Sequence, residues 1–104
     1  MKSETICFSG FVLAPKCLVS TKSKVKFMYR EKPKNIADSG WRFFTGNETD
    51  EYVNNPENIG IYSVSTITEI DPDIYPYLNS PFGCAFEREE IEQSFVAVEN
   101  FFSK

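Results

Sequence analysis

The residues best suited to bind a partner are concentrated in residues 38–44, which read DSGWRFF. This stretch contains the only Trp of the chain, followed directly by an Arg. Trp and Arg are the residue types most often found at the energetic centres of protein interfaces. If the backbone bends at Gly40, the side chains of Asp38, Trp41 and Arg42 can be presented together to a partner.

The same stretch also has a purely structural interpretation, as a β-strand. Successive side chains of a strand point to opposite faces. Trp41 and Phe43 would then point into a core, while Arg42 and Phe44 would face the other way. This interpretation is the simpler one, because it requires no partner.

An acidic segment follows directly, with Glu48, Asp50 and Glu51. Carboxylates placed there attract a basic partner over a distance and raise its association rate. A solvated loop is the simpler interpretation of the same residues. The candidate partner-binding residues predicted from the sequence are therefore Asp38, Trp41, Arg42, Glu48, Asp50 and Glu51.

Catalytic motifs are missing from the sequence. The chain has no His, which excludes a Cys–His nucleophile pair. Asp71 and Asp73 are the closest pair of carboxylates that could divide acid and base roles. They are explained more simply as a helix cap and a first-turn residue on either side of Pro72. No phosphate-binding glycine loop or nucleophile elbow is present, so we predict that the protein is not an enzyme and uses no cofactor.

The three cysteines, at positions 7, 17 and 84, show no metal-binding spacing. Without His or a CxxC pair, a zinc site is not expected. Scattered thiols fit a reducing cytosol, where free Cys packs as a small apolar residue. The apolar stretch 6–14 is interrupted at Ser9 and Gly10 and lacks a cleavage motif, so no signal peptide or membrane span is expected. These observations predict a cytoplasmic protein without a structural metal or disulfide.

The net charge of −4 hides a strong asymmetry along the chain. Residues 1–42 carry nine Lys or Arg against three acidic residues, and residues 43–104 carry two against twelve. The halves either neutralise one another on folding or leave an acidic face that steers a basic partner. In the basic part, Val25, Phe27 and Tyr29 alternate with the cations. This predicts a strand with a buried ring face and a solvated basic face, and no nucleic-acid binding.

The remaining patterns predict one α+β domain over residues 1–104, with a mostly antiparallel sheet and short helices. The expected strands are 17–21, 24–30, 41–45 and 59–64, followed by a hairpin of 84–87 and 95–98. The expected helical segments are 48–52, 65–70 and a short helix that begins at Pro72. The rings Phe27, Tyr29 and Phe43 are expected in the core.

Five segments in this order also resemble a known family: 27–33, 38–44, 58–62, 71–74 and 83–88. The family comprises immunity-protein-like domains, the thirty-third such class, of bacterial polymorphic toxin systems. It was formerly a bacterial domain of unknown function. The resemblance covers about Cys17 to Val98, and the family has acidic positions like Glu48 and Glu51.

The resemblance implies a small cytoplasmic protein that binds and neutralises a protein toxin by occlusion. Acidic side chains would then occupy positions that a nuclease toxin reserves for substrate phosphates. The competing interpretation is a generic regulatory or small-ligand-binding module, with a pocket under Trp41.

Overall fold

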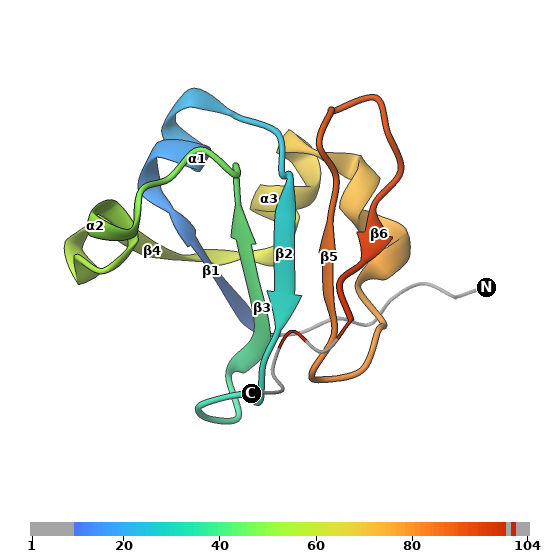
Figure 1. Ribbon diagram of the computed structural model, residues 1–104. Coiled ribbons are helices and arrows are strands. Elements are labelled where there is room, and N and C mark those ends of the chain that lie inside the picture. The colour runs from blue at the N-terminus through green and yellow to red at the C-terminus, as the bar shows by residue number, and fades with distance from the viewer. Residues whose placement is uncertain (1–9, 100, 102–104) are drawn as a thin grey trace.

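The computed structural model describes residues 10–99 and 101. In these residues a six-stranded sheet with the strand order β4-β1-β3-β2-β5-β6 is flanked by short helices (Figure 1). The strands are β1 (Phe11–Pro15), β2 (Phe27–Arg30), β3 (Asp38–Phe44), β4 (Ile59–Ser63), β5 (Ala85–Glu87) and β6 (Val96–Ala97). The helices are α1 (Lys16–Thr21), α2 (Asp50–Val53) and α3 (Val64–Ile70), with 3-10 segments η1 (Pro56–Asn58) and η2 (Pro72–Tyr77).

The sheet is mostly antiparallel, as the sequence predicts. Only the β1–β3 pair is parallel among the strand pairs of the described residues. The central pair β2–β3 places Phe27 opposite Phe44 and Arg30 opposite Trp41. The predicted α+β class is therefore confirmed.

One face of the sheet carries the core. Trp41 and Phe43 of β3 are fully buried, and their rings stack at 5.6 Å with an interplanar angle of 11°. The indole N–H of Trp41 donates a hydrogen bond to the Leu78 carbonyl oxygen at 3.1 Å. The core also includes Leu18 of α1, Ile67 of α3 and Ile74 of η2. In Figure 1, α3 lies behind the sheet, and β2 and β3 face the viewer with no helix across them.

Three local predictions are confirmed by this arrangement. Trp41 and Phe43 point into the core, and Arg42 and Phe44 face the other way. The hairpin of β5 and β6 forms around the acidic loop. Asp71 caps η2 by accepting a hydrogen bond from the Asp73 backbone N–H. Helix α3 begins at Val64, one residue before the expected segment 65–70, and Ser63 caps it.

The predicted strand 17–21 is wrong, because these residues form helix α1. A short apolar run of this kind has no periodicity that distinguishes a strand from a buried helical turn. The true strand is the preceding β1, whose sequence 11–15 is almost continuously apolar. Helix α1 buries Leu18, and it ends where Lys22 adopts a left-handed backbone conformation.

The predicted facing of strand 24–30 is also wrong. The strand begins only at Phe27, and Met28 is the fully buried side chain. Phe27 and Tyr29 are half-buried on the opposite face. Val25 is also buried, but it precedes the strand, and its backbone N–H donates to an Asp71 carboxylate oxygen at 2.8 Å. The strand alternation therefore does not extend back to Val25.

Candidate partner-binding face

The face of β1, β3 and β2 opposite the core is here called the open face. The register places Leu13 opposite Arg42, Tyr29 opposite Arg42, and Phe27 opposite Phe44. Directly paired residues project on the same side of a sheet. The open face therefore gathers two half-buried rings from β2, one from β3, and a buried arginine between them.

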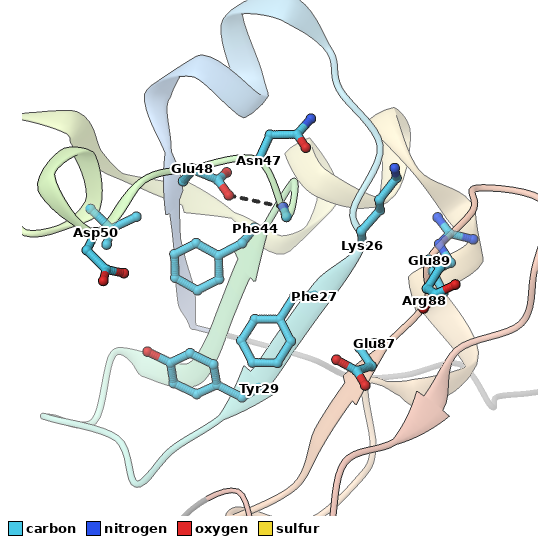
Figure 2. A pocket seen from close by; sticks show the side chains of 12 residues that line it. Lys26, Phe27, Tyr29, Phe44, Asn47, Glu48, Asp50, Glu87, Arg88 and Glu89 are labelled. Atoms are coloured by element: carbon cyan, nitrogen blue, oxygen red, sulfur yellow. Dashed lines mark hydrogen bonds between the residues drawn. The ribbon is translucent and has the colours of Figure 1, made fainter.

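A groove of about 570 Å³ lies on this face. Phe27, Tyr29 and Phe44 form its apolar floor, as Figure 2 shows. Carboxylates and cations from separate parts of the chain surround the floor: Lys26, Glu48, Asp50, Glu87, Arg88 and Glu89. The groove thus combines an aromatic floor with a predominantly acidic rim.

The floor rings form a contiguous cluster. The Tyr29 and Phe44 rings are nearly parallel at 5.9 Å, and Phe27 lies 5.8 Å from Tyr29 and 6.1 Å from Phe44. Phe101 also contacts this cluster, at 5.3 Å from Phe27 and 5.1 Å from Tyr29. Burial, and secondarily the charge of Glu31, raises the pKa of Tyr29, so its phenol stays neutral at physiological pH.

Arg42 is 2% exposed and anchors a hydrogen-bonded network under the open face. Its two terminal nitrogens donate to the two oxygens of Asp38 at 2.9 and 2.8 Å. Its Nε donates to Glu31 at 2.6 Å. The hydrogen bonds from Arg42 hold the pKa of Asp38 well below its usual range, against the opposing effect of burial. The backbone N–H groups of Lys34 and Gly40 lower it further.

A bulge in β3 makes this pairing possible. Phe11 is opposite Asp38 and Leu13 is opposite Arg42, so four steps along β3 match two along β1. In a regular strand, residues four apart are separated by about 13 Å, which the bulge shortens. Gly40 lies in the bulge with φ of +91°, and a Cβ there would overlap the Glu31 carbonyl oxygen. The glycine therefore does bend the chain, but it brings Asp38 and Arg42 together inside the fold.

The acidic rim is partly fixed by the backbone. Glu48 accepts hydrogen bonds from the Thr45 and Gly46 backbone N–H groups at 2.8 and 3.0 Å, which closes the turn after β3. Thr49 caps α2, and Asp50 and Glu51 occupy the first turn of that helix, both exposed. Asp50 lines the groove. Glu51 is on the same helix but does not line it.

The structure separates the six predicted partner-binding residues into two groups. Trp41, Arg42 and Asp38 are buried, with no more than 4% of each exposed. Glu48, Asp50 and Glu51 remain at the surface beside the groove. Sequence reasoning missed the ring floor and the rim residues Glu87 and Glu89. The signal was present in the rings that alternate at 27 and 29, but they were assigned to the core.

A second buried arginine explains the paired aspartates. Arg88 donates to Asp71 at 2.6 Å and to Asp73 at 2.9 Å, and its Nε donates to the Val25 carbonyl oxygen at 3.0 Å. Its guanidinium lies 4.3 Å from the Phe95 ring centroid. Asp71 and Asp73 therefore have a structural role: their ion pairs with Arg88 join η2 to the end of β5.

Residues 10–99 and 101 contain no cluster of three His, Cys, Asp or Glu arranged to hold a metal ion. Cys17 and Cys84 are free thiols, and Cys7 lies outside the described residues, as do residues 6–9 of the apolar stretch. Burial raises the pKa of the Cys84 thiol, which keeps it protonated. Within the described part of the chain, no helix has the length and apolarity needed to cross a membrane.

This α+β domain has a groove of rings and carboxylates, and its closest aspartate pair is ion-paired with Arg88. These are features of a binding protein. The family model described as the Immunity protein Imm33 domain matches residues 12–99. The chain therefore belongs to this immunity-protein family, which indicates an immunity-type function of a generally non-catalytic kind. Comparisons with curated proteins and with solved structures gave no match.

Proposed function

We propose that the protein binds a protein toxin in the cytoplasm and neutralises it by occlusion, without catalysis or a cofactor. The open face with its acidic rim is the toxin-facing surface in this proposal. The observation that carries it is the groove itself, in which three half-buried rings meet carboxylates from α2 and β5. Family membership supplies the kind of partner, a protein toxin.

The charges favour a basic partner surface. Asp50 and Glu51 project from α2 and are exposed, as are Glu87 and Glu89 at the other side of the groove. Arg88 lines the groove as well, but it is paired with Asp71 and Asp73. Long-range attraction to such a rim raises the association rate with a basic toxin, and salt weakens it over about 8–10 Å.

The buried residues have a positioning role in this proposal. Arg42 lines a second hollow of about 270 Å³ beside the groove, together with Tyr29 and Phe44. Its bidentate bond to Asp38 fixes the bulge of β3. The strand continues from this bulge to Phe44, which belongs to the floor of the groove. Trp41 supports β3 from the core side. None of the three needs to touch the toxin.

The test is protection in cells that co-express this protein with the toxin recovered with it from the native host. The double variant Asp50→Lys/Glu51→Lys should lose protection while its thermal midpoint stays close to the native value, because both side chains are exposed. The matched control is Glu69→Lys on α3, which changes an exposed carboxylate away from the groove. Full protection by the double variant would contradict the proposed surface.

The groove volume also favours the second candidate, a small-ligand-binding module, since ligand pockets commonly measure about 300–1,000 Å³. The sequence predicts such a pocket under Trp41, but the side chain of Trp41 is fully buried and packs against Phe43. A ligand would instead occupy the open face. A small molecule that raises the thermal midpoint of the native protein, but not of a Phe44→Leu variant, would favour this candidate.

A further inference from the structure

We propose that the groove receives an arginine-bearing segment of the partner, with a guanidinium group over the ring floor and paired with a rim carboxylate. The inference deepens the proposed function and rests on it for the kind of partner. It adds the chemistry that the partner must present. Its test is separate, because it needs only this protein and a peptide.

The floor is suited to a planar cation. Figure 2 shows Phe27, Tyr29 and Phe44 side by side, each half-buried, with their rings turned toward the open side of the groove. The Tyr29 and Phe44 rings are within 15° of parallel. The face of an aromatic ring carries negative partial charge and attracts a cation that lies over it.

The rim supplies carboxylates on both sides of this floor. Asp50 lies beside Phe44, and Glu87 lies on the other side, near Phe27 (Figure 2). Both are exposed. Lys26 is the lysine that lines the groove, and Arg88 adds little net positive charge because Asp71 and Asp73 neutralise it. A cation that enters the groove is therefore surrounded mainly by carboxylates.

The chain itself already holds arginine in this way. Arg88 lies 4.3 Å from the Phe95 ring centroid and donates to two carboxylates. A ring face combined with a carboxylate at its edge matches the planar, forked guanidinium better than the compact ammonium of lysine. An apolar segment would bury the rim carboxylates without a counter-charge, which is unfavourable, and an acidic segment would be repelled.

The experiment titrates the ¹⁵N-labelled chain of 104 residues with the blocked peptide acetyl-Gly-Arg-Gly-Arg-Gly-amide. Matched peptides carry Lys or Glu in place of both arginines. The arginine peptide should shift the backbone amide signals of Phe27, Tyr29, Phe44 and Asp50. It should bind more tightly than the lysine peptide, and the glutamate peptide should not bind.

Two variants separate the charge from the rings. Asp50→Asn/Glu87→Gln should weaken arginine-peptide binding about three- to tenfold, since exposed ion pairs contribute modestly. Phe44→Leu should weaken it about threefold and reduce the preference over lysine. If Phe44→Leu does not fold, Tyr29→Leu takes its place. The control Glu57→Gln/Glu69→Gln removes the same charge from outside the groove and should leave binding unchanged.

Equal binding of the arginine and glutamate peptides, or signal shifts confined to residues outside the groove, would overturn the inference. So would unchanged binding in both groove variants. If the peptide result is negative while Asp50→Lys/Glu51→Lys still loses protection against the toxin, the proposed function stands and only the arginine chemistry is wrong. If Asp50→Lys/Glu51→Lys loses both peptide binding and protection, the result supports the proposed function and the arginine chemistry together.

Discussion

The two faces of the central strands both carry aromatic side chains, but these side chains differ in burial and in their neighbours. On the covered face, Trp41, Phe43 and Met28 are fully buried under α1, α3 and η2. On the open face, Phe27 and Phe44 keep part of their rings exposed, and charged side chains surround them. Half-exposed rings contribute less to the stability of the fold than fully buried ones, and this contrast fits the proposed binding on the open face.

The two buried arginines differ in the parts of the fold that they hold together. Arg88 joins η2 to β5, and its charge is neutralised inside the structure. Arg42 is just as buried, and each arginine has one partner that reaches solvent, because Asp73 keeps 59% of its side chain exposed and Glu31 keeps 34%. The first network fixes two elements to each other. The second fixes the bulge of β3 beside the groove.

Removing one ring from each face gives the largest expected difference. Phe43→Ala should lower the free energy of unfolding by about 3–5 kcal/mol, because a fully buried ring leaves a cavity. Phe27→Ala should lower it by roughly half as much, since the half-buried ring has less packing to lose. Urea unfolding of both variants measures this. Equal losses would mean that Phe27 belongs to the core and that the open face is not open.

Breaking the open-face network should have the next largest effect. Arg42→Met leaves Asp38 buried without its counter-charge and should cost about 3 kcal/mol. In the double variant Asp38→Asn/Arg42→Met, much of that loss should be recovered, because no unpaired charge remains. Chemical unfolding of the single and double variants checks the expectation. A double variant that is less stable than Arg42→Met would contradict it.

Gly40→Ala should destabilise the protein by about 1–3 kcal/mol. The added Cβ would meet the Glu31 carbonyl oxygen, and the positive φ is unfavourable for any residue with a side chain. Gly83 supplies the matched control. It has φ of +94° but open space around its Cβ position, so Gly83→Ala should cost less. Thermal unfolding compares the two, and similar losses would show that φ alone matters.

A smaller effect is expected from pH. The pKa of Asp38 is lower in the folded protein than in the unfolded chain, so ionised Asp38 stabilises the fold. That contribution is complete above the unfolded pKa of about 4 and is lost as pH falls toward the folded pKa. The stability difference between the native protein and Asp38→Asn should therefore narrow between pH 6 and pH 2. A constant difference would show that Asp38 is not held by Arg42.

The fold was predictable where local pattern decided it. The facing of Trp41 and Phe43, the cap at Asp71 and the β5–β6 hairpin follow from alternation and from Pro72. Helix α1 was not predictable, because six apolar and polar residues after Pro15 suit either state. The predicted facing of β2 was wrong because the alternation was counted from Val25. That residue precedes the strand, and its backbone N–H bonds to Asp71, 46 positions away.

The candidate site was predictable in part for the same reason. Glu48, Asp50 and Glu51 follow the tryptophan motif along the chain, so their proximity to it is local. Glu87 and Glu89 reach the groove only through the pairing of β2 with β5, which no nearby residue specifies. The burial of Arg42 depends on the bulge at Gly40 and on Glu31 across the β2–β3 loop. Long-range register, rather than residue type, determines which charges share the groove.

The central claim is that the open face is where the toxin docks. The most direct measurement recovers tagged protein from the native host and quantifies the proteins that copurify with it. Native protein, Asp50→Lys/Glu87→Lys and the control Glu69→Lys are compared side by side. A protein with a toxin domain should copurify with the native protein and the control, and its recovery should fall at least tenfold with the groove variant. Equal recovery with the groove variant would place the toxin on another surface and contradict the claim.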